Sequence, residues 1–145
     1  MPSRGSINLP FTRRNDARPK TMPITWFTDR DRRFRIGYLP ADATIDAFAE
    51  SVHEHVRPVP GFADFDEMTV FADLSRLMET APPARAAEIV ASLYGAERRA
   101  RTALVVRRQV DFGILRMYAA YRDRDEDSLQ VFYDVDEALA WLGFA

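Results

Sequence analysis

Short apolar runs alternate with amphipathic stretches through the second half of this chain, and this alternation constrains the fold more than any other feature. The runs Thr69 to Leu74, Thr102 to Val106 and Leu129 to Tyr133 predict strands. Between them apolar residues recur at helical spacing, which predicts helices. Because parallel strands joined through a helix return by a right-handed crossover, we expect these three strands to run parallel in one sheet.

The run from Thr69 to Ser75 is apolar almost to its end, as is typical of a strand covered on both faces. It ends on Asp73 and Ser75. In a domain of alternating strands and helices, we expect a functional group at this end of the strand. We expect residues 76–81 to form a loop that leads into the next helix, which begins with two prolines. Thr80 is expected to cap that helix.

The first half of the chain predicts a hairpin and a helix. Residues Ile24 to Phe27 and Arg33 to Leu39 are short β-prone runs separated by a charged turn. Thr44 can cap a following helix that has a single apolar stripe. At the end of the chain, Asp134 and Glu137 form a capping box for a last helix. We therefore expect an α/β domain whose mixed sheet has about five strands, antiparallel in the N-terminal hairpin and parallel afterwards, with about four helices.

The chain divides into a tail and one domain. With 145 residues, of which 47% are hydrophobic, it can bury a single core, which we place in residues 23–145. Residues 1–22 carry five basic side chains against one acid, with three prolines and no regular period, so we expect a disordered basic tail. Such a tail could bind nucleic acid, but spaced charges with few aromatics favour a solvated tail.

Several classes of site are excluded or disfavoured. The chain has no cysteine, so it has neither disulfides nor thiolate metal ligands. His53 and His55 are two residues apart on a predicted helix and point to different faces, so they cannot share one metal. No nucleophile elbow, phosphate loop or dinucleotide fingerprint occurs in the sequence. We expect no metal, no cofactor and no catalytic activity.

The sequence also bears on location. A membrane-spanning helix needs a run of about 20 apolar residues, and no such run occurs. The first residues lack the apolar centre of a secretory signal. We therefore expect no transmembrane segment and a cytoplasmic location.

The predicted helix from Asp111 to Tyr121 carries more apolar surface than packing on one sheet face requires. One stripe contains Ile114, Met117, Tyr118 and Tyr121, and a second contains Phe112, Leu115 and Ala119. Either neighbouring helices cover both stripes, or part of this surface serves a partner or a hydrophobic ligand. Arg116, between the stripes, could bind a carboxylate or phosphate, or form a structural salt bridge. The candidate surface comprises Phe112, Leu115, Arg116, Met117 and Tyr118.

The order of elements resembles the STAS superfold, and in particular the SpoIIAA-like bacterial proteins, often labelled lipid-transfer-like. The resemblance spans about residues 23–145. It is carried by Val70 to Ser75, by Leu115-Arg116-Met117-Tyr118 and by the closing Ala138-Leu139-Ala140-Trp141-Leu142. Anti-sigma-factor antagonists of this superfold carry a phosphorylatable Ser or Thr after an Asp, at the start of the helix that follows the third strand. This chain has Met78 to Pro83 there, with neither an Asp-Ser pair nor a glycine, so we do not expect a phosphorylation switch.

The resemblance implies a non-catalytic regulatory or protein-interaction module, whose partner is another protein or a second copy in a homodimer. The alternative is a carrier or sensor of a lipid-like hydrophobic small molecule. The first function predicts a flat apolar patch around the helix that contains Arg116 and a stable oligomer. The second predicts an enclosed pocket between that helix and the sheet, lined by Phe112, Leu115, Met117 or Tyr118.

Overall fold

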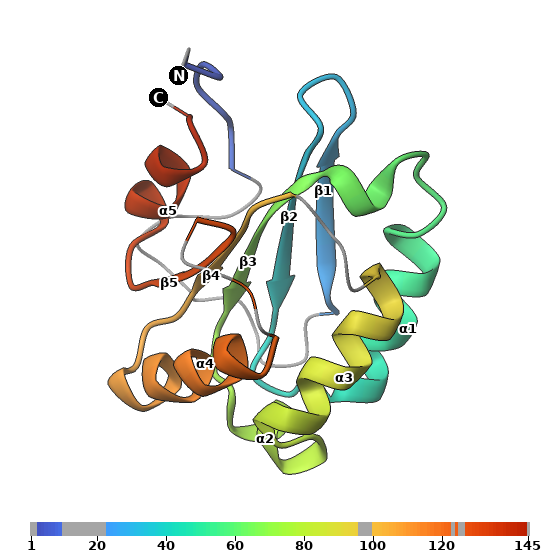
Figure 1. Cartoon of the computed structure of the whole chain (residues 1–145), viewed down its shortest axis with the longest axis vertical. Helices are drawn as coiled ribbons and strands as arrows, with labels where there is room; N and C mark the ends of the chain where they lie inside the picture. Colours follow the sequence, from blue (N-terminus) through green and yellow to red (C-terminus); the bar gives the residue numbers. More distant parts are fainter. Residues whose placement is uncertain (1–2, 10–22, 96–99, 123, 125–126, 145) are drawn as a thin grey trace.

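The computed structural model describes residues 3–9, 23–95, 100–122, 124 and 127–144. In these residues five strands form one sheet in the order β1-β2-β3-β4-β5 (Figure 1). The strands are β1 (Thr25–Asp29), β2 (Phe34–Leu39), β3 (Asp66–Phe71), β4 (Thr102–Val105) and β5 (Leu129–Phe132). β1 and β2 are antiparallel, and β2 to β5 are parallel. The predicted α/β fold with a mixed sheet and an N-terminal hairpin is confirmed.

Five α-helices and one short 3-10 helix connect and cover the strands of the described chain. They are α1 (Ile45–His55), η1 (Phe62–Asp64), α2 (Ser75–Thr80), α3 (Pro83–Tyr94), α4 (Gln109–Arg122) and α5 (Val135–Trp141). The additional helix is α2, so the prediction of a loop at residues 76–81 is wrong. A local contact explains the difference, because the Asp73 carboxylate accepts a hydrogen bond from the Ser75 backbone N–H at 2.7 Å and starts the first turn.

The helices are divided unequally between the two faces of the sheet. Right-handed crossovers that advance in one direction place α1, α3 and α4 on the same face. One core lies between these helices and the sheet and includes Leu39, Val52, Leu104 and Leu115. The second core lies on the opposite face, where α5 covers the sheet. Figure 1 shows α5 on the far side of the molecule from α1 and α3.

Strand β3 begins earlier and ends earlier than the sequence predicts. It spans Asp66–Phe71 instead of Thr69 to Leu74, because its pairing with β2 runs from Phe34 opposite Asp66 to Leu39 opposite Phe71. Two consecutive acids at its start do not indicate a strand by propensity. Basic side chains from other parts of the chain neutralise both acids, as Asp66 pairs with Arg4 and Glu67 with Arg35.

Part of the N-terminal segment packs on the domain. Ile7 is buried in the second core, and the Arg4 backbone N–H donates to the Gly143 carbonyl at 2.8 Å. The Arg4 guanidinium lies 2.6 Å from the Asp66 carboxylate and 4.6 Å from the centre of the Phe144 ring. We expected a disordered tail here, but residues 3–9 lie against the end of α5 (Figure 1). Residues 10–22 lie outside the described residues.

Two predicted helix caps are present. The Thr44 hydroxyl accepts from the Ala47 backbone N–H at 3.1 Å at the start of α1. The Asp134 carboxylate accepts from the Asp136 backbone N–H at 2.7 Å at the start of α5. Both caps follow from residues that are adjacent in sequence, which is why the sequence alone reveals them.

Candidate functional site

Exposed apolar side chains gather at α4. Four large hydrophobic residues of the described chain are at least half exposed, namely Val110 (59%), Met117 (54%), Tyr121 (57%) and Tyr133 (50%). Three of them lie on α4. The fourth, Tyr133, stacks on Phe112 of α4 with ring centroids 4.6 Å apart and an interplanar angle of 14°. Single exposed hydrophobics are normal on protein surfaces, but several on one helix are typical of an interaction site.

Val110, Met117 and Tyr121 belong to one face of the helix. Val110, Ile114, Met117 and Tyr121 follow the i, i+4, i+7, i+11 spacing of a single helical stripe. Gly113 and Ala120 are exposed beside them. We call these six residues the α4 face. It contains no charged side chain, whereas the solvent side of a surface helix is normally polar.

The structure separates the residues that the sequence grouped around Arg116. Leu115 is buried in the core under α4, and Tyr118 is half-buried. Phe112 is half-buried against Tyr133. Met117 belongs to the α4 face, and Arg116 is exposed at its edge. The two stripes therefore include both core and surface positions of the same helix.

A cavity of about 60 Å³ lies between the sheet and the helices α1, α3 and α4. Its walls are mostly apolar and include Leu39, Phe48, Phe71, Leu104 and Leu115. The described polar residues in its lining are Glu67, Thr69, Tyr94, Thr102, Tyr118, Arg122 and Arg124. Of the four residues predicted to line a ligand pocket, Leu115 and Tyr118 line this cavity, whereas Phe112 and Met117 are not in its lining.

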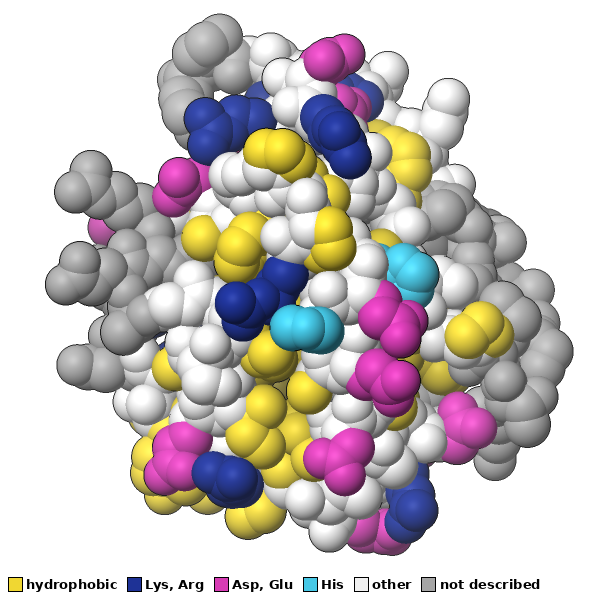
Figure 2. Space-filling model, turned by 90° about the vertical axis from the view of Figure 1, so that its right-hand side faces the viewer, with side chains coloured by type: hydrophobic (Ala, Val, Ile, Leu, Met, Phe, Trp, Pro, Cys, Tyr) yellow, Lys and Arg dark blue, Asp and Glu magenta, His cyan; other side chains and the backbone are white. Residues whose placement is uncertain are grey.

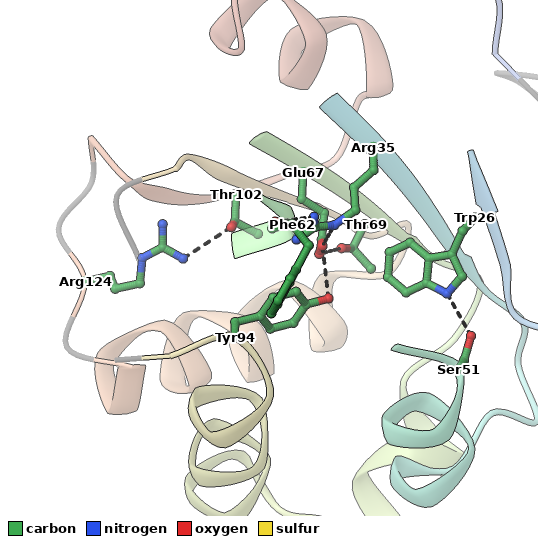
Figure 3. A network of polar contacts seen from close by, with 9 residues as sticks. All are labelled: Trp26, Arg35, Ser51, Phe62, Glu67, Thr69, Tyr94, Thr102 and Arg124. Carbon is green, nitrogen blue, oxygen red and sulfur yellow. Dashed lines mark hydrogen bonds and ion pairs between the residues drawn. The ribbon is translucent and has the colours of Figure 1, made fainter. Parts of the chain in front are cut away.

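A buried polar network adjoins the cavity (Figure 3). The Glu67 carboxylate accepts from Arg35 Nε at 2.7 Å, from the Tyr94 hydroxyl at 3.1 Å and from the Thr69 hydroxyl at 2.5 Å. Arg35 also donates to the Phe62 carbonyl at 2.6 Å, and its guanidinium lies 5.1 Å from the centre of the Tyr94 ring. Arg35 and Glu67 are both buried. This network was not predicted from the sequence. The signal present in the sequence was a charged residue, Arg35 or Glu67, inside each of two strands whose other residues are mostly apolar.

A second polar cluster lies at the carboxyl ends of β3 and β4, where Arg108 joins three partners. Its Nη2 atom lies 3.1 Å from both Asp73 Oδ1 and Ser75 Oγ. The same guanidinium binds the Asp111 carboxylate at 2.8 and 3.0 Å, and Asp111 is 1% exposed. The hydrogen bond to Asp111 raises the pKa of Arg108 above its usual range. The cluster connects the turn after β3 to the first turn of α4, and both Asp73 and Ser75 contact Arg108 in it.

Thr80 lies apart from this cluster and does not cap α3. It is the last residue of α2, and its hydroxyl accepts from the Ile45 backbone N–H at 2.9 Å while donating to the Leu77 carbonyl at 2.8 Å. Pro82 occupies the cap position of α3 without a side-chain hydrogen bond. The predicted capping role is therefore wrong, and Thr80 links the end of α2 to the start of α1.

The described residues contain no group of three potential metal-ligating side chains. His53 and His55 are exposed on α1, and Figure 2 shows the two imidazoles at separate places on the surface. No helix in the described part of the chain is long and apolar enough to cross a membrane.

Comparison with protein-family models, with curated proteins and with solved structures gave no match.

Proposed function

We propose that this chain is a non-catalytic protein-interaction module of the SpoIIAA-like type, and that the α4 face is the surface that binds its partner. The observation that carries the proposal is the gathering of exposed large hydrophobics on and against one helix. The buried centres of protein interfaces are depleted in charge and enriched in aromatic and methionine side chains. The α4 face meets this description with Met117 and Tyr121 and no charged residue.

The charges that α4 itself carries beside the α4 face favour an acidic partner. Arg116 is exposed at its edge, and Arg122 ends the helix. The single acid within α4, Asp111, is buried and held by Arg108, so it does not offset these charges at the surface. We therefore propose that the partner segment has apolar side chains flanked by Asp or Glu, because opposite charges across an interface favour the correct pairing.

The shape of the α4 face supports a helical partner segment. A Cβ atom built on Gly113 would have no atom within 4 Å, so packing within this chain does not require a glycine there. Glycine within a helix costs about 1 kcal/mol relative to alanine. Ala120 lies about two helical turns beyond Gly113. Because both residues are small, they leave a shallow depression between the larger side chains of the α4 face. A partner helix could bring its backbone close at this point, with ridges set into grooves.

A second copy of this chain fits the α4 face less well than a different protein. An antiparallel pairing of two α4 helices about a two-fold axis near Met117 would bring Arg116 of both copies together. Like charges placed opposite each other disfavour such a pairing. We therefore propose a heteromeric partner, not the homodimer that the sequence leaves open.

Site-specific photocrosslinking in the host cell tests this proposal. A benzophenone amino acid replaces Met117 on the α4 face, and the control carries it at Glu137, which is exposed on α5 across the sheet. We expect Met117 alone to capture a partner whose contact segment has apolar residues at helical spacing between acidic ones. A crosslink to a second copy of this chain, a basic contact segment, or equal capture from both positions would contradict the proposal.

The captured segment can then be synthesised as a peptide, and its affinity for this chain can be measured. Tyr121→Ala and Arg116→Glu should each weaken its binding about tenfold or more, since anchoring residues at interface centres dominate affinity and charge reversal opposes an acidic partner. Arg76→Glu on α2 is the matched control and should leave the affinity unchanged. Equal losses in all three variants would argue against the α4 face.

A further inference from the structure

We infer that the cavity between the sheet and helices α1, α3 and α4 binds a small anion with a short apolar body, such as a short-chain carboxylate. This inference does not rest on the partner surface, because it concerns the inner side of α4 and the buried network beside it; the two share only Arg122, which ends α4 and also lines the cavity. It rests on the unusual polarity of the sheet face beneath the helices, the sign of the charges that line the cavity, and the cavity's size.

The sheet face that packs under α3 carries polar groups where apolar ones would be expected. Arg35 on β2, Glu67 and Thr69 on β3, and Thr102 on β4 are all buried on this side of the sheet. Burying polar groups costs free energy unless partners satisfy them. Tyr94 from α3 adds its hydroxyl to the same network. An apolar cavity with a few converging polar groups at one side is typical of a small-molecule site.

The charges of the described residues that line this side of the cavity sum to positive. The Glu67 carboxylate already accepts three hydrogen bonds, and the Arg35 guanidinium neutralises its charge. The other charged side chains in the described lining are those of Arg122 and Arg124. The positive surplus favours a ligand with an anionic head, for which guanidinium groups are well suited.

Arg124 is held in position from both sides. Its Nη1 atom donates to the Thr102 hydroxyl at 3.2 Å, and its Nη2 atom donates to the Ser128 carbonyl at 2.7 Å and to the Ala100 carbonyl. Figure 3 shows Arg124 and Tyr94 reaching toward the sheet from the loop and helix layer. A preorganised guanidinium binds an anion without a large loss of side-chain freedom.

The Arg35 guanidinium lies behind two residues of the cavity wall and is not itself part of the lining. It contacts Glu67 and Tyr94, both of which line the cavity. Its Nη2 atom is buried and has no hydrogen-bond partner among the residues that the structure describes. A buried donor in this state is costly, so an oxygen atom of a ligand or a water would stabilise it.

The volume of the cavity sets the size of the ligand. About 60 Å³ is available, and one water needs about 10–15 Å³ of such space, so the cavity holds on the order of four waters. This favours a body of a few carbon atoms over a long lipid chain. Tyr118 and Arg122 line the cavity from successive turns of α4 and are partly exposed, which places the entry along this helix.

Titration of the purified full chain with hexanoate, followed by NMR of methyl groups, tests the inference. 1-Hexanol is the neutral probe of the same length, and decanoate is the longer acid. We expect saturable shifts of the Leu104 and Leu115 methyl groups with hexanoate, and at least tenfold weaker binding of both hexanol and decanoate. Equal binding of hexanol would overturn the anionic head, tighter binding of decanoate would overturn the size limit, and the absence of saturable shifts would overturn the site.

Two variants locate the binding. Arg122→Gln should weaken hexanoate binding about tenfold, while Arg116→Gln, which changes a residue outside this cavity, should not. Ala86 is buried and lines the cavity, so Ala86→Leu should fill it and abolish binding while the amide spectrum stays folded. If Ala86→Leu unfolds the chain, Tyr94→Phe serves in its place and should weaken binding by removing one hydroxyl from the polar side. Undiminished binding in Arg122→Gln and in the folded cavity variant would place the ligand elsewhere and overturn the inference.

Discussion

Arg35 Nε donates to Glu67 Oε1 over 2.7 Å, and both side chains are almost inaccessible to solvent, with 2% and 5% of their surface exposed. The pair joins neighbouring positions of β2 and β3, since Arg35 lies opposite Glu67 in the register of the two strands. A buried ion pair stabilises a protein only when its geometry and its additional hydrogen bonds offset the cost of removing both charges from water. Here Tyr94 and Thr69 supply the additional hydrogen bonds to the carboxylate.

Replacing one member of this pair should be far more damaging than replacing both. Glu67→Leu leaves the Arg35 charge buried without its carboxylate, and we expect a loss of about 3–5 kcal/mol in the free energy of unfolding. The double variant Arg35→Met with Glu67→Leu should recover most of that loss. Urea unfolding monitored by circular dichroism measures both, and a loss below about 1 kcal/mol for Glu67→Leu would show that water reaches the pair.

Gly37 on β2 should not tolerate a side chain. A Cβ atom there would lie 2.6 Å from Cζ3 of Trp26, the residue opposite it on β1. The Trp26 ring donates to the Ser51 hydroxyl at 2.7 Å, so displacing the ring also strains the contact between β1 and α1. We expect Gly37→Ala to lower the free energy of unfolding by about 1–3 kcal/mol. Urea unfolding together with tryptophan fluorescence measures the loss and the displacement.

The same substitution at Gly113 should have the opposite effect. Gly113 lies in the exposed face of α4, and no atom would lie within 4 Å of an added Cβ. Gly113→Ala should raise the free energy of unfolding by about 0.5–1 kcal/mol, because alanine loses less backbone freedom in a helix. If a partner helix packs closely on this position, the same variant should bind that partner more weakly. A stabilised variant with unchanged partner affinity would remove Gly113 from the interface.

Asp29 should stabilise the folded state at neutral pH and lose this contribution at acidic pH. The Arg32 backbone N–H, at 3.0 Å, is the largest cause that lowers the pKa of Asp29 below 3.8, followed by the Arg32 side chain at 2.6 Å. Because the pKa of the folded state is lower than that of the unfolded state, the contribution is present above pH 3.8 and is lost as the pH falls through the folded value. Asp29→Asn should therefore be less stable than the parent chain at neutral pH, and the difference should shrink under acid. Unfolding curves across that range, with NMR titration of the Asp29 carboxyl, check the sign.

Local features of the sequence sufficed for the order of the elements. Hydrophobic spacing separates strands from helices over a few residues, so the hairpin and the alternating units were predictable. The caps at Thr44 and Asp134 were predictable for the same reason, since each contact spans two or three residues. The prediction missed α2 because its six residues are too few to show a helical period, although the contact of the Asp73 side chain with the Ser75 backbone is as local as those caps.

The sequence by itself determined that this chain is an α/β domain with a mixed sheet, because the periods of strands and helices are local properties. Only the tertiary structure decided which polar groups meet, since Arg35 and Glu67 are 32 residues apart and are joined by the register of β2 with β3. It also decided the roles of the two apolar stripes on α4. Packing against the sheet and α3 sets the rotation of this helix, so Leu115 enters the core while Met117 remains at the surface.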